Sequence, residues 1–183
     1  MSYSLLAKRL RLPLGFILSG AFLVLARPQP GGLALGGGIA LVGVLVRAWA
    51  SGHIMKNDRL ATTGPYAHTR NPLYFGSFLI SAGFALAAHW SLLLLVAGFF
   101  ALIYVPTMER ERANIAGRFP EAYKAYAANV PMFVPRLTPW RGADGASAGS
   151  FSSALYMKHG EWKAALGYLA ALLVLALKLR YAA

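Results

Sequence analysis

The stretch Leu60-Ala-Thr-Thr-Gly-Pro-Tyr-Ala-His-Thr-Arg-Asn-Pro-Leu-Tyr74 lies between two long apolar segments and decides how the chain is organised. Gly64-Pro65 predicts a turn, because both residues favour the backbone angles of turns. Pro72 stands at the start of the next apolar run, where a helix accepts proline without losing a hydrogen bond. We therefore expect the chain to re-enter a membrane as a helix that begins at Pro72.

The same stretch carries groups that suit a ligand. A helix start beside Arg70 favours an anionic group, and the rings of Tyr66 and Tyr74 offer faces that attract a cation. An ordinary interfacial loop anchored by its tyrosines is the alternative interpretation. The stretch is thus a candidate binding site on residue chemistry alone.

Composition places the chain in a bilayer. Of its 183 residues, 57% are hydrophobic and only 13% are charged, with a mean hydropathy of +0.51. The net charge of +12 does not indicate nucleic-acid binding, because the basic residues stand beside apolar runs and form no basic arm. The absence of cysteine excludes disulfides, thiolate metal sites and cysteine nucleophiles, and no metal site is predicted.

Apolar periodicity predicts an all-α integral membrane bundle of about five transmembrane helices. The N-terminal apolar run, which follows Lys8, Arg9 and Arg11, is interpreted as a retained helix and not as a cleaved signal peptide. Glycines at positions 36, 37, 38 and 43 are expected to let helices approach closely. The predicted spans are residues 12–26, 33–49, 72–88, 92–105 and 164–177.

Three segments organise this chain. Residues 1–50 form a two-helix scaffold, residues 51–136 the core with the candidate site, and residues 137–183 a linker and a last helix. Within the core, Phe119, Tyr123 and Tyr126 have the spacing of an amphipathic helix. The linker is expected at Gly142–Ser153, which is rich in Gly, Ala and Ser.

The basic residues favour one orientation. With five spans, most lysines and arginines and all six acidic residues fall on the side of the N-terminus, and basic residues mark the cytoplasmic side. We therefore expect the N-terminus and the site to face the cytoplasm. On the helix that follows the fourth span, Tyr104, Met108 and Glu111 share one face, so Glu111 looks back toward the site.

Several motifs together resemble one enzyme family. They are Gly64-Pro-Tyr-x-x-x-Arg-Asn-Pro-x-Tyr74, a glutamate about forty residues later, Phe119, Tyr123-x-x-Tyr126 and Val130-Pro131, with Gly52-His53-Ile-Met-Lys-Asn57 before them. In order and spacing they resemble the isoprenylcysteine carboxyl methyltransferases and the related phospholipid methyltransferases. The resemblance covers roughly residues 50–136.

This resemblance implies a membrane-embedded enzyme that binds S-adenosyl-L-methionine in a cytosolic cofactor pocket and methylates a lipophilic acceptor. The acceptor is either an isoprenylcysteine-like carboxylate or a phospholipid amine, and the oligomeric state is left open. Catalytic roles are carried over to Arg70, Tyr74 and Glu111. The implied cofactor contacts are Lys56, Asp58, Arg59, Leu60, Ala61, Tyr66, Asn71, Pro72, Leu73, Tyr74 and Glu111.

The acceptor side is less defined. His53, Tyr104 and Thr107 are the candidates. The prenylcysteine enzymes carry an arginine at the position of Thr107, so a prenylcysteine carboxylate is doubtful as the substrate. Two alternatives to a methyltransferase remain open: a membrane reductase of the sterol reductase type that uses NADPH, and a non-catalytic membrane scaffold.

Overall fold

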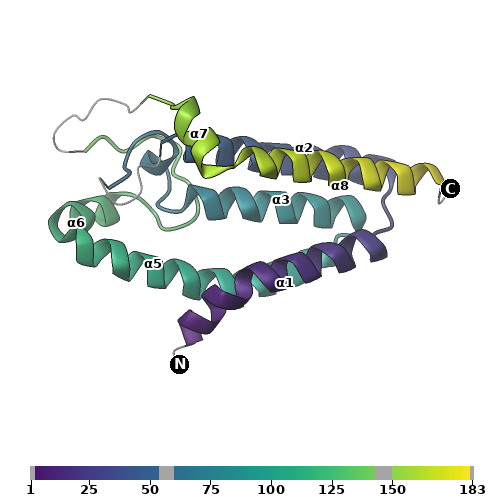
Figure 1. Cartoon of the computed structure of the whole chain (residues 1–183), viewed down its shortest axis with the longest axis horizontal. Coiled ribbons are helices and arrows are strands. Elements are labelled where there is room, and N and C mark those ends of the chain that lie inside the picture. Colours follow the sequence, from purple (N-terminus) through teal and green to yellow (C-terminus); the bar gives the residue numbers. More distant parts are fainter. Residues whose placement is uncertain (1–2, 54–59, 143–149, 182–183) are drawn as a thin grey trace.

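The computed structural model describes residues 3–53, 60–142 and 150–181, and these form an all-helical bundle without strands (Figure 1). Its elements are α1 (Tyr3–Leu25), α2 (Pro30–Ser51), the 3₁₀ turn η1 (Gly64–Ala67), α3 (Pro72–Ala88), α4 (Leu92–Phe99), the π-helical turn η2 (Phe100–Tyr104), α5 (Val105–Arg118), α6 (Pro120–Asn129), α7 (Ser153–His159) and α8 (Trp162–Tyr181). The all-α prediction is confirmed for the described residues. Helix α3 begins at Pro72, as the sequence predicts.

The long helices form two groups in the bundle. Figure 1 shows α2, α3 and α8 side by side, with α1 and α5 crossing below them. Helices α6 and α7 gather with the connecting loops at one end of the bundle, and the C-terminus lies at the other. The loop end holds the predicted site, so we call it the site end.

Within the described residues, three helices are long and apolar enough to cross a membrane: α2, the continuous helix Leu92–Arg118 and α8. Helix α3 is apolar but has only 17 residues. Helix α1 has 23 residues, carries Lys8, Arg9 and Arg11 in its N-terminal half, and is not among the candidates. The membrane character of the chain is therefore supported for three helices, which contain the predicted second, fourth and fifth spans, and the first and third spans, residues 12–26 and 72–88, stay predictions.

Small residues join α2 to α3. A Cβ atom added to Gly36 would lie 2.2 Å from the Gly83 carbonyl oxygen, and one added to Gly43 would lie 2.6 Å from the Gly76 carbonyl oxygen. Neither position has room for a side chain, so the two backbones meet directly. The prediction that this glycine-rich run serves helix packing is confirmed at Gly36 and Gly43, whereas a Cβ at Gly38 would meet nothing within 4 Å.

A proline interrupts the helix Leu92–Arg118 without ending it. Pro106 has no N–H to donate to the Leu102 carbonyl one turn earlier, and prolines inside helices leave such carbonyls unpaired. The chain responds with the π-helical turn at Phe100–Tyr104, and the Tyr3 hydroxyl donates to the Leu102 carbonyl at 2.6 Å. Helix α1 thus supplies the hydrogen bond that Pro106 cannot make.

The C-terminal helix pair docks onto α2. The Arg47 guanidinium forms two hydrogen bonds with the Glu161 carboxylate, at 3.0 and 2.8 Å, and both side chains are largely buried. Its third nitrogen donates to the hydroxyl of Ser77 and the carbonyl of Leu73 on α3. Arg47 therefore joins α2, α3 and the turn between α7 and α8.

One apolar core draws on distant parts of the chain. Ala26, Ala40, Phe84, Ala87, Ala88 and Leu175 form a buried cluster. Helix α7 begins at Ser153, the last residue of the segment predicted as linker, and was not predicted; Ser152 caps its start and Gly160, at a φ of +68°, ends it. Residues 143–149 of that linker lie outside the described residues.

Candidate functional site

The stretch from Tyr66 to Asn71 is held in place by the segment Val130–Trp140. Three backbone bonds of 2.9 Å join them, from Arg70 N to Pro131 O, from Arg136 N to His68 O and from Trp140 N to Ala67 O. The stretch therefore lies alongside the later segment, and its turn is fixed by contacts about seventy residues downstream in sequence.

Side-chain hydrogen bonds add to these backbone bonds, and we call the two sets together the clamp. Thr69, which is buried, donates to the Phe133 carbonyl at 2.9 Å, and the Asn71 amide donates to the Met132 carbonyl at 2.9 Å. The buried Tyr126 hydroxyl donates to the Tyr66 carbonyl at 2.7 Å. Asn71 thus has a structural contact in addition to the cofactor role predicted for it.

Gly64 makes the turn possible. It has a φ of +58°, which side chains rarely adopt, and a Cβ there would lie 2.5 Å from the His53 ring. His53 packs into this position, and its Nδ1 lies 2.9 Å from the Trp49 carbonyl oxygen. The ring is thereby fixed between the end of α2 and the turn.

The centre of the site is the pair Tyr74 and Glu111. The Tyr74 hydroxyl donates to the Glu111 carboxylate at 2.9 Å, so α3 and α5 meet where the sequence predicts that Glu111 looks back toward the site. Tyr104 stands edge-on to Tyr74, with ring centroids 5.4 Å apart. Both predicted catalytic side chains are half-buried, which leaves them partly accessible to a ligand.

A third group completes this pair. The Arg11 guanidinium on α1 donates to the Tyr74 hydroxyl, and its central carbon lies 5.4 Å from the centre of the Tyr74 ring. The order across the three helices is therefore Arg11, Tyr74, Glu111. Sequence reasoning treated Arg11 only as a membrane flank, because nothing in its spacing connects it with α3.

Tyr66 points its hydroxyl into the same region. Burial raises the pKa of the Tyr66 hydroxyl above its ordinary value, the negative charges of Glu161 and Glu111 raise it further, and Arg47 lowers it. Tyr66 therefore stays neutral and lies within electrostatic range of Arg47–Glu161 and of Glu111. Glu161 was not expected at the site; its position directly before the last apolar helix was the only signal in the sequence.

Arg70, the third predicted catalytic residue, has a different neighbour. Its Nη1 donates to the Tyr123 hydroxyl at 2.8 Å, and its guanidinium lies over the Tyr123 ring. Its Nε is buried and has no hydrogen-bond partner within the described part of the chain. A buried donor without an acceptor is costly, so Arg70 retains one donor that an anionic ligand would satisfy.

The other predicted residues are distributed as follows. Leu60 packs against the Tyr123 and Tyr126 cluster, Ala61 is half-buried, and the Leu73 carbonyl accepts from Arg47 and Ser77. Thr107 is fully buried and donates to the Ile103 carbonyl at 2.6 Å. Lys56, Asp58 and Arg59 lie outside the described residues.

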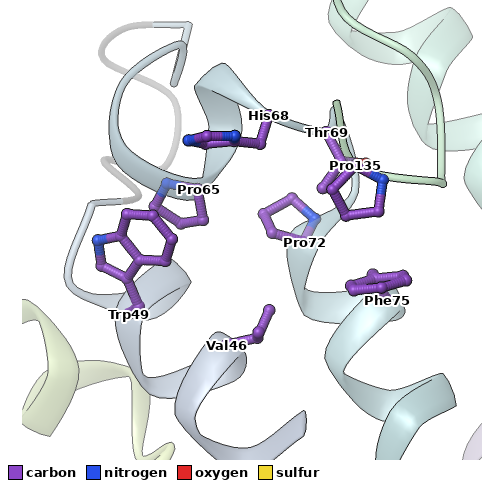
Figure 2. Close-up of a pocket in the computed structure, with 8 residues that line it drawn as sticks. All are labelled: Val46, Trp49, Pro65, His68, Thr69, Pro72, Phe75 and Pro135. Carbon is purple, nitrogen blue, oxygen red and sulfur yellow. The ribbon is translucent and has the colours of Figure 1, made fainter. Parts of the chain in front are cut away.

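An apolar cavity of about 200 Å³ opens beside the clamped stretch. Figure 2 shows Trp49, Pro65 and His68 on one side of it and Phe75 and Pro135 on the other. Val46, Thr69 and Pro72 complete its lining, so Pro72 is the one predicted cofactor residue there. Rings and prolines suit a flat or aliphatic group, and the Tyr74–Glu111 pair is not part of the lining.

Comparisons with known proteins agree with the motif pattern. A sequence model described as phospholipid methyltransferase matches residues 33–121, which confirms the resemblance over that part of the chain. No solved structure matches the chain.

Two curated proteins are similar to the chain. One is the cobalt-zinc-cadmium resistance protein CzcN of Cupriavidus metallidurans, 37% identical over 111 residues, which are 59% of this chain and 50% of that protein. The other is the nickel-cobalt-cadmium resistance protein NccN of Alcaligenes xylosoxydans xylosoxydans, 36% identical over 110 residues, which are 58% of this chain and 50% of that protein. The chain spans about half the length of these relatives.

Proposed function

From the match of residues 33–121 to the phospholipid methyltransferase family, we propose that the chain is a membrane-embedded methyltransferase that uses S-adenosyl-L-methionine. Its acceptor is a lipophilic molecule, either a carboxylate of the isoprenylcysteine kind or a phospholipid amine. The observation that carries the proposal is the Tyr74–Glu111 pair, which joins α3 to α5 at 2.9 Å beside the clamped turn.

The residues present fit the cofactor. S-adenosyl-L-methionine presents a carboxylate, an ammonium, a ribose diol and a sulfonium. Glu111 has no cation within 4 Å among the described residues, so its carboxylate is available to the ammonium or to the diol. The unsatisfied Nε of Arg70 suits the carboxylate, and the neutral tyrosines Tyr66 and Tyr74 suit the sulfonium.

When bound, the cofactor supplies a methyl group on a positively charged sulfur that leaves readily. The protein has to align the acceptor with that methyl group and exclude water. Tyr74 holds Glu111 in one orientation through its hydroxyl, and the clamp on Thr69 and Asn71 fixes the turn that faces them. These contacts restrict motion on both sides of the site.

The acceptor enters from the bilayer in this proposal. The three candidate spans support a chain that is embedded in lipid, so a lipophilic acceptor reaches the site between helices without crossing water. The site end carries the acidic residues and most of the basic ones, and we place it at the cytoplasmic face. Lys56, Asp58 and Arg59 stay proposed cofactor contacts from the resemblance.

The names of the relatives favour a second candidate, a role in resistance to divalent metals. Among residues 3–53, 60–142 and 150–181, no group of three or more His, Asp or Glu side chains is placed to hold a metal ion. An enzyme that methylates a membrane lipid can also contribute to metal resistance. This second candidate therefore concerns what the reaction does for the cell and leaves its chemistry as proposed.

Ligand binding tests the proposal. Calorimetry on the detergent-purified protein is expected to show binding of S-adenosylhomocysteine, and Glu111→Gln is expected to weaken it about ten-fold or more, because a charged acceptor is lost. Glu109→Gln is the matched control, since the Glu109 side chain is 43% exposed and pairs with Arg112 at 2.7 Å on another face of α5.

Other ligands distinguish the alternatives in the same assay. Binding of NADPH without S-adenosylhomocysteine would replace the methyltransferase with a reductase, and binding of neither would favour a scaffold. Binding of Zn²⁺ or Co²⁺ would support a direct metal role. Transfer of a radiolabelled methyl group to a membrane lipid extract then identifies the acceptor class.

A further inference from the structure

Helix α1 lies outside the part of the chain that matches the family, residues 33–121, yet it contributes a cation to the centre of the site. Its Arg11 is half-buried and donates to the Tyr74 hydroxyl, which in turn donates to Glu111. Nothing in the family match assigns a role to this arginine. Its contacts therefore require a separate explanation.

The position of α1 is fixed at both ends. Near its start, the Tyr3 hydroxyl donates to the Leu102 carbonyl at 2.6 Å, which Pro106 leaves without its helical partner. Near its end, the Lys178 ammonium donates to the carbonyls of Leu23 and Val24 at 2.8 and 2.7 Å. Because both ends are held, Arg11 is directed at Tyr74 by the fold and not by a flexible terminus.

The charges around Tyr74 are separated. No carboxylate lies within 4 Å of the Arg11 guanidinium among the described residues, and the same holds for cations around Glu111. In a half-buried site of low dielectric, opposite charges attract strongly, and a direct ion pair is the expected outcome. The Tyr74 hydroxyl occupies the position between them and prevents it.

This separation leaves each charge available to a different partner. A guanidinium has five N–H donors, and Arg11 uses one of its nitrogens for Tyr74. On α5, the neighbouring Thr107 carries no charge, and its hydroxyl already donates to the Ile103 carbonyl. If Glu111 holds the cofactor, Arg11 is the cation beside Tyr74, within the part of the chain that the structure describes, that remains for a second, anionic molecule.

We propose that Arg11 binds the anionic group of the methyl acceptor and so makes the enzyme selective for anionic amphiphiles. The recognised group is a carboxylate or a phosphate, which a guanidinium binds through paired hydrogen bonds. The proposal rests on the methyltransferase function. It adds to that function a specificity-determining residue supplied by α1.

Amphiphiles with one tail and different head groups test this proposal. Dodecanoate, dodecyl phosphate and dodecanol are titrated into the protein in neutral-detergent micelles with S-adenosylhomocysteine at saturation. We expect the wild type to bind at least one of the two anions about ten-fold or more tightly than dodecanol, because charge-assisted hydrogen bonds stabilise only the anions. The comparison of carboxylate with phosphate identifies the head group.

Variants test whether a preference for anionic amphiphiles over dodecanol depends on Arg11. Arg11→Gln is expected to abolish the preference, Arg11→Lys to keep part of it, and Arg9→Gln, an exposed arginine on the same helix, to leave it unchanged. S-adenosylhomocysteine should still bind Arg11→Gln within about three-fold of the wild type. That result separates acceptor recognition from simple support of Tyr74.

The outcomes that overturn the proposal are distinct. Equal binding of dodecanol and both anions by the wild type, or a preference that survives in Arg11→Gln, removes the role of Arg11. Joint loss of anion preference and of S-adenosylhomocysteine binding in Arg11→Gln shows that the arginine only positions Tyr74. Failure of the wild type to bind S-adenosylhomocysteine refutes the methyltransferase function instead, whatever the anion assay gives.

Discussion

At the scale of single residues, the hydroxyl of Tyr74 is the group on which the site depends most. It accepts from Arg11 and donates to Glu111, so it keeps two opposite charges apart. Tyr74→Phe removes this hydroxyl and keeps the ring. We expect Glu111 to turn toward Arg11 and the affinity for S-adenosylhomocysteine to fall about ten-fold or more, as calorimetry would measure.

A tyrosine outside the site provides the comparison. Tyr168 on α8 donates to the Gly37 carbonyl at 3.2 Å, far along the chain from Tyr74, and Tyr168→Phe is expected to leave ligand affinity unchanged. Equal affinity in Tyr74→Phe and the wild type would contradict the assignment of Glu111 to the cofactor.

Sequence reasoning reached part of this site. Helical spacing placed Glu111 toward the re-entering helix, and its bond to Tyr74 agrees with that placement. The partners of Arg70 and Asn71 could not be predicted, because Tyr123 and Met132 are brought to them by a segment that follows two further helices. The contact of Arg11 with Tyr74 was not predicted for the same reason, since the two residues are 63 positions apart in sequence.

At the scale of helices, the contact between α2 and α3 limits which residues the bundle accepts. A Cβ at Gly36 would lie 2.2 Å from the Gly83 carbonyl oxygen, and backbone cannot yield as a side chain can. We expect Gly36→Ala to force the helices apart and to destabilise the protein by about 1–3 kcal/mol. Thermal unfolding in detergent measures the effect as a lower Tm.

Gly38 is the internal control, two residues later on the same helix. A Cβ there meets nothing within 4 Å, and alanine is the better helix former by roughly 1 kcal/mol. Gly38→Ala is therefore expected to keep or raise the Tm. If Gly36→Ala and Gly38→Ala changed the Tm equally, the close approach of α2 and α3 at Gly36 would be contradicted.

Helix positions could be predicted from apolar periodicity, because each long apolar run has to be buried in the protein or inserted into the membrane. The predicted second, third and fifth spans, residues 33–49, 72–88 and 164–177, fall within α2, α3 and α8. The π-helical turn before Pro106 and the short α7 were not predicted. Both depend on tertiary contacts, the first on Tyr3 and the second on the docking of Glu161.

At the scale of the whole molecule, Arg47 and Glu161 join residues 33–121, which match the family model, to the C-terminal helices. Side-chain exposures of 23% and 14% show that both charges are largely removed from water. Glu161→Gln leaves the Arg47 charge without its counterion, and we expect a loss of about 3–5 kcal/mol of stability. The double variant Arg47→Met/Glu161→Leu should recover much of it, because no buried charge remains.

An exposed ion pair serves as the reference for that experiment. Glu109 and Arg112 are 43% and 53% exposed, and exposed pairs contribute about 0–1 kcal/mol. Arg112→Gln should therefore change the Tm little. A double variant at Arg47 and Glu161 that is less stable than Glu161→Gln would show that the pair contributes more than its charges cost to bury.

The orientation of the chain in the membrane is testable because the sequence contains no cysteine. Gln29 and Thr138 are exposed and lie at opposite ends of the bundle, in the turn between α1 and α2 and beside the clamped stretch. Because basic residues are concentrated at the site end, we propose that this end faces the cytoplasm. A membrane-impermeant maleimide should therefore label Gln29→Cys in intact cells and Thr138→Cys only after the membrane is opened.

Ala40→Cys calibrates this experiment, because Ala40 is buried in the core and should react only after denaturation. Labelling of Thr138→Cys alone in intact cells would show that the orientation is the opposite of the one proposed. The site would then lie outside the cytoplasm, away from the supply of S-adenosyl-L-methionine. Labelling of both from one side would mean that the helices between them cross the membrane an even number of times in total. Since Gln29 and Thr138 are separated by α2, α3 and Leu92–Arg118, the expected result requires an odd number of crossings among the three. If α2 and Leu92–Arg118 both cross, as their length and composition allow, the 17-residue α3 must cross as well.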